Sequence, residues 1–166
     1  MSDLKEKLEG IAYQRPVRIR AIVQKPAVGV HALVEHAVVE AGLGLVGDHR
    51  KKDWCKGKRI PEREVTAISI EVLEALGSSP EVPGDNLILE GMDLRMLAAG
   101  QRIRVGIDVV LQRAVKNHRP CHLFARRISE EARAAVSEAN LRGALFSVIS
   151  GGEISVGDPV ILEENE

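Results

Sequence analysis

A chain of 166 residues with a formal net charge of −1, 45% apolar and 28% charged residues has the composition of one soluble globular domain. The balanced charge excludes a chain-wide attraction to nucleic acid, and an aromatic content of 2% disfavours a sheet that stacks single-stranded bases. Two cysteines are too few for a disulfide framework and fit a reducing compartment, so we expect a cytoplasmic protein.

The N-terminal half of the sequence predicts mainly strands. Residues 1–15 read as a polar tail or short helix without a signal peptide's apolar segment, and one domain is expected over residues 16–164. Residues 15–24 alternate apolar and basic side chains, as a half-buried strand does. Residues 31–48 fit a helix or a strand, and Val38, Val39 and the glycines that follow favour a strand and then a loop. Residues 63–69 predict a strand, and residues 69–77 predict a short helix that ends at Gly77.

The C-terminal half continues the same pattern. Residues 86–91 predict a strand, 93–100 a helical turn, and 101–106 with 108–115 a hairpin. Residues 129–140 give the clearest helix, because Ser129 can cap its start and Asn140 can end it. Residues 144–150 predict a strand, Gly151-Gly152 signals a hairpin turn, and residues 153–156 and 159–164 complete the strands.

About eight short strands and three or four short helices indicate a mostly β protein with minor α. The close, turn-rich spacing favours a closed or sandwich-like β domain, and no repeating βαβ pattern is present. No apolar run approaches the ~20 residues of a membrane span, so no membrane association is expected.

Familiar catalytic and metal motifs are missing from the sequence. It contains no GxxxxGK[ST], GxGxxG, GxSxG, HExxH or CxxC. Three turn clusters remain, at Gly47-Asp48, at residues 84–86 and at Gly157-Asp158, and local features alone indicate ordinary turns.

Cys121 has the most reactive setting that the sequence offers. It follows Pro120 and lies close to His118, Arg119, His122 and two further arginines, and nearby cations stabilise a thiolate. A thiolate is both a nucleophile and a soft metal ligand. Two alternatives stay open here: a buried structural cysteine, and a zinc site that Cys121 forms with His118 and His122.

Residues 49–63 are rich in lysine and arginine. Such a stretch is either a solvated loop or a local anion site, because lysine and arginine attract phosphate.

The order of several short motifs resembles the MOSC domain, named for the C-terminal domain of molybdenum cofactor sulfurase. The motifs are GLVGDHR at 44–50, GDNLILEGMDL at 84–94, AAGQRIRVG at 98–106, RPC at 119–121 and RGALFSVISGGEISVGDPV at 142–160. The resemblance spans about residues 17–163. Family members often have Gly-Asp-Arg-His where this chain has Gly-Asp-His-Arg, and Gly-Glu-Asn where it has Gly-Asp-Asn.

The resemblance implies a closed β-barrel like the β-barrel domain of pyruvate kinase. It also implies binding of molybdenum cofactor, with Cys121 as the key thiolate that ligates molybdenum or handles sulfur. The further candidate residues for binding the cofactor are polar or basic: Asp48, His49, Arg50, Arg59, Arg63, Asn86, Arg119 and Arg142. Within the basic stretch, we expect Arg50, Lys58, Arg59 and Arg63 to bind the anionic end of the cofactor, joined by Arg142.

Three functions follow as hypotheses. The chain binds molybdenum cofactor and reduces N-hydroxylated compounds, it carries the cofactor or its sulfur without catalysis, or Cys121 is a redox sensor without molybdenum. The chain has no room for a pyridoxal-phosphate domain and no ferredoxin-type cysteines, so a complete cycle needs a partner that donates electrons or a cysteine desulfurase.

Overall fold

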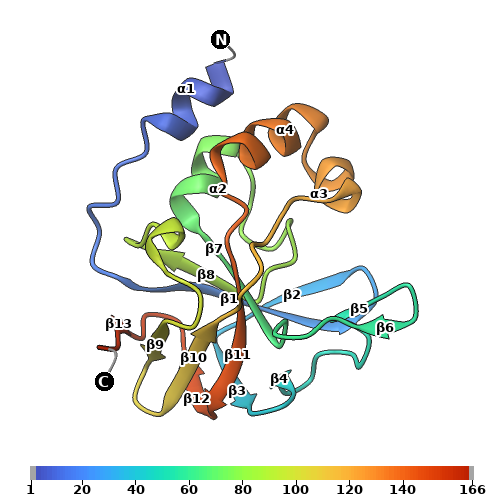
Figure 1. Cartoon of the computed structure of the whole chain (residues 1–166), viewed down its shortest axis with the longest axis vertical. Helices are drawn as coiled ribbons and strands as arrows, with labels where there is room; N and C mark the ends of the chain where they lie inside the picture. The colour runs from blue at the N-terminus through green and yellow to red at the C-terminus, as the bar shows by residue number, and fades with distance from the viewer. Residues whose placement is uncertain (1–2, 165–166) are drawn as a thin grey trace.

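The structure is a computed structural model that describes residues 3–164 (Figure 1). Its helices are α1 (Asp3–Glu9), α2 (Ile70–Leu76), α3 (His122–Arg127) and α4 (Glu130–Ala139), with a 3-10 turn η1 (Leu94–Met96). Its strands are β1 (Arg18–Ala27), β2 (Val30–Val34), β3 (His36–Glu40), β4 (Gly44–Leu45), β5 (Trp54–Cys55), β6 (Lys58–Arg59), β7 (Val65–Ser69), β8 (Leu87–Glu90), β9 (Arg102–Val105), β10 (Val109–Arg113), β11 (Ala144–Ser150), β12 (Gly152–Ser155) and β13 (Val160–Leu162). The prediction of a mostly β protein with minor α is confirmed.

Eight strands form the main sheet, in the order β13-β9-β10-β11-β7-β8-β1-β2. A second sheet has the order β12-β3-β4, and β5 pairs with β6. Within residues 3–164 the strand pairing does not close into a ring, so the expected closed barrel is not found. The start of β1 nevertheless contacts the segment just before β13, although these strands lie near opposite ends of the strand order. Arg18 forms an isolated β-bridge with Pro159, and the Ile19 amide donates to the carbonyl of Asp158 at 2.9 Å.

Two hydrophobic cores lie on opposite faces of the main sheet. One core fills the space between the sheets, and the other lies under the helices that gather at one end of the molecule in Figure 1. In β8, Leu87 and Leu89 enter the first core and Ile88 enters the second, because successive side chains on a strand point to opposite faces. Both faces of this strand are therefore apolar.

The helix ends agree with their sequence signals. The Ser129 hydroxyl accepts from the Ala132 amide at 3.0 Å, and Asn140 ends α4 in the left-handed region with φ 55°. Gly77 ends α2 with φ 70°. In the described part of the chain, α4 is the longest helix, as predicted, and no helix is long and apolar enough to cross a membrane.

Two strand connections differ from the expectation. Gly151-Gly152 does not form a hairpin, because β11 pairs with β10 and β7 whereas β12 pairs with β3. A Cβ at Gly151 would lie 2.5 Å from the carbonyl oxygen of Val39, so glycine lets the chain pass close to β3 and change sheets. In addition, β7 and β8 are parallel and α2 connects them, which gives a single βαβ unit that the sequence did not indicate.

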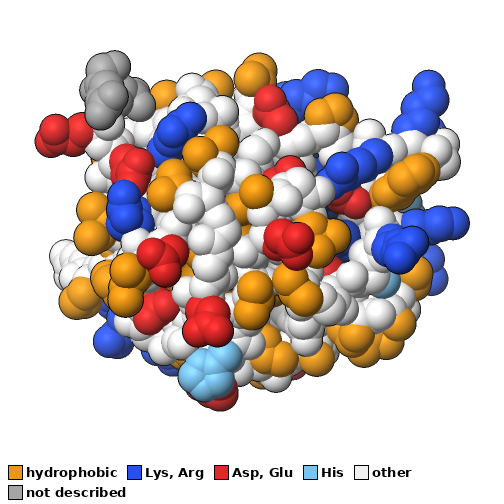
Figure 2. Space-filling model, turned by 90° about the horizontal axis from the view of Figure 1, so that it is seen from below, with side chains coloured by type: hydrophobic (Ala, Val, Ile, Leu, Met, Phe, Trp, Pro, Cys, Tyr) orange, Lys and Arg blue, Asp and Glu red, His pale blue; other side chains and the backbone are white. Residues whose placement is uncertain are grey.

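Charged side chains on the surface opposite the helices are mixed in sign. Figure 2 shows acidic, basic and apolar groups interspersed there. Lysine and arginine gather toward the right-hand side of that view, the side on which β5 and β6 lie in Figure 1. The local positive charge therefore lies near the basic stretch even though the whole chain is almost neutral.

Candidate functional site

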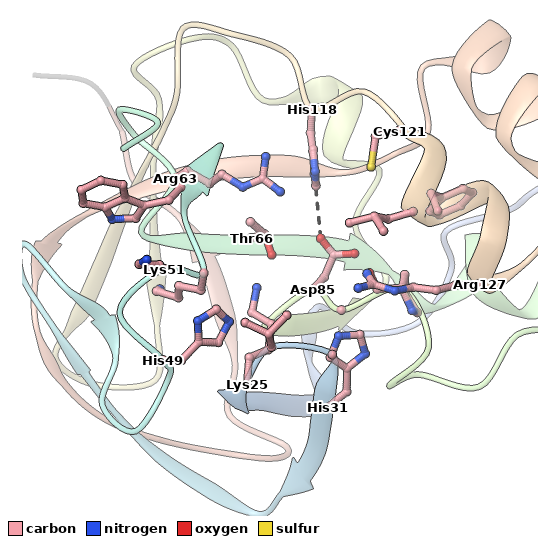
Figure 3. Close-up of a pocket in the computed structure, with 18 of the residues that line it drawn as sticks. Lys25, His31, His49, Lys51, Arg63, Thr66, Asp85, His118, Cys121 and Arg127 are labelled. Atoms are coloured by element: carbon pink, nitrogen blue, oxygen red, sulfur yellow. Dashed lines mark hydrogen bonds and ion pairs between the residues drawn. The ribbon is translucent and has the colours of Figure 1, made fainter. Parts of the chain in front are cut away.

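A cavity of about 300 Å³ lies where the end of β1, the loop after β4, the starts of β7 and β8, and the segment before α3 meet (Figure 3). Seven lysine and arginine side chains line it: Lys25, Lys51, Lys52, Arg63, Arg119, Arg127 and Arg142. Among the described residues, Asp85 is the one acidic side chain in this lining. The cavity is therefore a cationic cavity in a protein with a net charge of −1.

Cys121 immediately precedes α3 and lines the cationic cavity. The residue is exposed, so the alternative of a buried structural cysteine is wrong. Partial burial would raise the pKa of the thiol, but the backbone amides of Phe124 and Leu123, together with the Arg142 and Arg63 cations, outweigh burial and lower it. The site thus favours a thiolate.

Lys25 and Arg63 bring positive charge into the cavity, where Asp85 attracts both cations only at longer range. Neither the Lys25 amine nor the Arg63 guanidinium has a hydrogen bond or an ion pair in the described structure. Burial lowers the pKa of Lys25 to about 8, and burial likewise lowers the pKa of Arg63. A bound anion would supply the interactions that these two cations lack.

Asp85 holds the Arg142 side chain in the lining of the cavity. Its Oδ2 accepts from Arg142 Nη1 at 2.5 Å, and the Arg142 guanidinium lies 5.0 Å from the centre of the Phe124 ring. Burial would raise the pKa of Asp85, but Arg142, through its charge and its hydrogen bond, and the Lys25 cation favour the carboxylate and hold the pKa low. Asp85 therefore fixes Arg142 at the edge of the cavity, beside the segment that carries Cys121.

Gly84 allows the side chains of His31 and Arg127 to lie close to the backbone beside Asp85. Its φ of 89° lies in the left-handed region, and a Cβ there would meet the ring of His31 at 2.8 Å and Arg127 Nη1 at 3.1 Å. Arg127 also donates to the carbonyl of Pro83 at 3.0 Å. Only glycine fits these two requirements without strain.

The cavity brings together part of the set of residues proposed from the sequence. The proposed residues that line it are His49, Arg63, Arg119, Cys121 and Arg142. Arg50, Lys58 and Arg59 lie outside its lining, and all three are exposed. Arg59 is held by Asp53 Oδ2 at 2.8 Å and by the carbonyl of Gly42 at 2.9 Å, so its charge already has partners.

Asp48 and Asn86 support the site from outside the lining. Asp48 accepts from the Lys25 amide at 2.7 Å and from Asn86 Nδ2 at 2.9 Å. Asn86 also accepts from the Thr66 amide at 3.2 Å. These hydrogen bonds join β1, the loop after β4, and the starts of β7 and β8, the same segments that form the cavity.

The structure places further side chains in the cavity that the sequence did not single out: Lys25, His31, Thr66, Asp85 and Arg127. The sequence did contain one signal for Lys25, because it follows the apolar residues of the predicted strand, and in the structure it lies on the same strand, β1. Arg127 was expected only as a neighbour of Cys121 in sequence. It reaches the cavity because residues 122–127, for which the sequence predicted no helix or strand, form α3.

The zinc site suggested by the two histidines beside Cys121 is not found. His118 lines the cavity and is buried, whereas His122 is exposed and lies outside the lining. Within residues 3–164 no group of three His, Cys, Asp or Glu side chains is arranged to hold a metal ion.

Comparison with known proteins identifies the family. A sequence model of the MOSC domain matches residues 59–161, well over half of the chain. The chain belongs to the MOSC domain family. A comparison of this MOSC protein with curated proteins finds no match.

Solved structures share the fold of this chain over most of its length. The YuaD protein from Bacillus subtilis is similar with a TM-score of 0.71 and 19% identity, over 90% of this chain and 97% of that one. YiiM from Geobacillus stearothermophilus is similar with a TM-score of 0.66 and 18% identity, over 90% and 76% of the two chains. YiiM from Escherichia coli gives a TM-score of 0.62 and 21% identity, over 91% and 72%.

Proposed function

We propose that this MOSC protein binds molybdenum cofactor in the cationic cavity, with Cys121 as the thiolate that meets the metal. The observation that carries the proposal is the union, in one cavity, of a thiol with a lowered pKa and seven basic side chains. Thiolates are soft ligands, and basic side chains recognise the phosphate that the pterin carries. The residues present therefore fit the group that is characteristic of the family.

Within the cavity, the residues divide into an anion-binding part and a thiol part. Lys25, Arg63 and Arg127 would hold the anionic end, because the first two lack partners and the third is fixed by the Pro83 carbonyl. Cys121 would supply the metal ligand. When bound, the cofactor supplies a metal centre that exchanges electrons and an oxygen atom with a substrate.

The reaction that we propose for this site is reduction of an N-hydroxylated compound. Two electrons and two protons convert the N–OH group to N–H and release water, so an external electron donor is part of the proposal. Handling of cofactor sulfur is the second candidate, and the exposure of Cys121 favours it because a desulfurase partner could reach the thiol. Both cysteines are free, which fits the cytoplasm that we propose as the location.

Molybdenum analysis of the purified protein tests the cofactor proposal. Protein made in a host with intact cofactor synthesis should contain molybdenum, Cys121→Ser should lose it, and Cys55→Ser should keep it. Cys55 is the matched control because it is also a free, exposed thiol but lies outside the cavity lining. Loss in Cys55→Ser alone, or equal loss in both variants, would contradict the assignment.

Turnover measurements then separate the two candidate activities. Consumption of an N-hydroxylated substrate by the loaded protein with a chemical reductant supports the reductase. Molybdenum without turnover, together with a persulfide on Cys121 after incubation with a cysteine desulfurase, supports sulfur handling. A molybdenum-free protein whose Cys121 oxidises reversibly would instead support the redox sensor.

A further inference from the structure

His118 lies in the wall between two cavities. It lines the cationic cavity, and it also lines a smaller cavity of about 140 Å³ whose other lining residues include Asn117, Ser137 and Asn140. Only 6% of the residue is exposed. A polar cavity of this size has room for water, so solvent can reach the histidine from the side of α4.

The contacts of His118 leave its imidazole incompletely satisfied. Its Nδ1 is 3.8 Å from Asp85 Oδ1, and both atoms are buried without a hydrogen-bond partner (Figure 3). The other oxygen of Asp85 is held by Arg142 at 2.5 Å, so the carboxylate is fixed in place. An N–H at Nδ1 would point toward a stationary negative charge, which stabilises an imidazolium.

Opposing this carboxylate are three cations from other parts of the fold. Burial lowers the pKa of His118 well below its ordinary value, and Arg142, Arg63 and Lys25 lower it further, whereas Asp85 raises it. Burial and these three cations therefore favour the neutral imidazole. An anion among these cations would cancel much of their effect and leave the attraction of Asp85 in place.

We propose that His118 takes up a proton when an anion occupies the cationic cavity and thereby strengthens the binding of that anion. The proton passes from solvent in the smaller cavity to the imidazole, where a new N–H bond forms and the ring becomes positively charged. Asp85 and Arg142 are positioning residues for this step. The inference rests on the proposed anion-binding function and adds that the site binds its ligand and a proton together.

Nuclear magnetic resonance titration of the histidine side chains tests this coupling directly. The probe is inorganic sulfate, whose charge is constant near neutral pH, and chloride at the same ionic strength is the control. Saturating sulfate should raise the pKa of His118 above its value in the chloride control. His118→Gln identifies the resonance.

Sulfate affinity gives a second readout. It should increase as the pH falls, by up to about tenfold per pH unit if one proton is bound with the anion. In His118→Gln this dependence should be lost, and in His122→Gln it should remain. His49→Gln and His31→Gln show whether either of the other histidines in the cavity lining contributes to the proton uptake.

The outcomes separate this inference from the cofactor proposal. Sulfate binding that leaves the pKa of His118 unchanged, or a pH dependence that persists in His118→Gln, would overturn the inference and leave the anion site standing. If sulfate shifts no resonance of the cavity lining, both the anion site and the inference are refuted. If His118→Gln does not fold, the titration of the unaltered protein still decides.

Discussion

The ion pair between Asp85 and Arg142 gives the sharpest prediction for stability. The side chain of Asp85 is 0% exposed and that of Arg142 is 8% exposed. Replacement of Arg142 by methionine keeps most of the side-chain volume but leaves the carboxylate buried without its main cation. Breaking a buried pair from one side typically costs about 3–5 kcal/mol, because the remaining charge cannot reach water. For a chain of this length that corresponds to a decrease in Tm of roughly 6–20 °C.

The pH dependence of this loss follows from the lowered pKa of Asp85 in the folded protein. A carboxyl whose folded pKa lies below its unfolded value stabilises the fold at pH values above the unfolded pKa. That contribution is lost as the pH falls through the folded pKa. In Arg142→Met, burial raises the pKa of Asp85, so the carboxyl protonates at a higher pH. The difference between variant and parent should therefore be largest near pH 7 and smaller near pH 5.

Urea denaturation at these two pH values measures the effect. The matched control is Arg104→Met, which removes an arginine from the exposed pair with Glu163 and should cost less than about 1 kcal/mol. The double variant Asp85→Asn with Arg142→Met should recover part of the loss, because the unpaired charge is gone. A cost in Arg142→Met as small as in the control, or one independent of pH, would refute the reasoning.

Three further predictions concern the cationic cavity. Arg63→Ala and Lys25→Ala should each weaken sulfate binding by roughly 10- to 150-fold, because a charge-assisted contact is worth ~1.5–3 kcal/mol. In a calorimetric titration the control Lys58→Ala, which lies outside the cavity lining, should bind sulfate like the parent. Equal affinities in all three variants and the parent would exclude the site. Iodoacetamide should alkylate Cys121 with a lower midpoint pH than it alkylates a cysteine in a short peptide, as measured by mass spectrometry. Arg63→Gln should raise that midpoint, and an unchanged midpoint would show that Arg63 does not act on the thiol. Gly84→Ala should lose about 1–3 kcal/mol of folding stability from backbone strain and should also bind sulfate weakly. The control Gly57→Ala, at a glycine with φ 78° and open space around it, should lose stability but not sulfate binding. Intact sulfate binding in Gly84→Ala would show that the cavity tolerates a methyl group at this position.

Local signals in the sequence identified most elements of the fold. The helix from Glu130 to Ala139 was predictable because Ser129 and Asn140 mark its ends within a short window. The six-residue helix α3 was not, because three of the residues in His122–Arg127 are polar or charged and the segment has no apolar repeat long enough to detect. Its stability comes from burial of Phe124 and Ala125 against the rest of the protein, which is a tertiary effect.

The change of sheet at Gly151-Gly152 was also beyond local reasoning. Two glycines between strands are a genuine hairpin signal, yet here they allow the close approach to Val39 that moves the chain from β11 to β12. Which partner a strand chooses depends on the completed packing of both sheets. The sequence therefore predicted the strands better than it predicted their neighbours.

For the site, adjacency in sequence was a poor guide to direction in space. Asp85 and Asn86 are neighbours, but Asp85 faces the cavity while Asn86 bonds to Thr66 and Asp48 behind it. The motif that contains both residues was visible, and it supplied Asn86 as a cofactor-binding candidate, whereas Asp85 is the member that lines the cavity. On an extended backbone, a step of one residue changes the face to which a side chain points.

The basic stretch shows how the same residue type acquires opposite roles. Arg59 points to Asp53 and holds the β5–β6 segment, so its charge is used within the fold. Arg63, four residues later, lies half-buried in the cavity without a partner, where its positive charge costs stability. Lys25, on β1, bears the same kind of cost. Two desolvated cations that converge on one cavity are unfavourable for folding alone, and a ligand that brings negative charge offsets this cost. The arrangement of unsatisfied charge, more than the number of basic residues, is what indicates a binding site here.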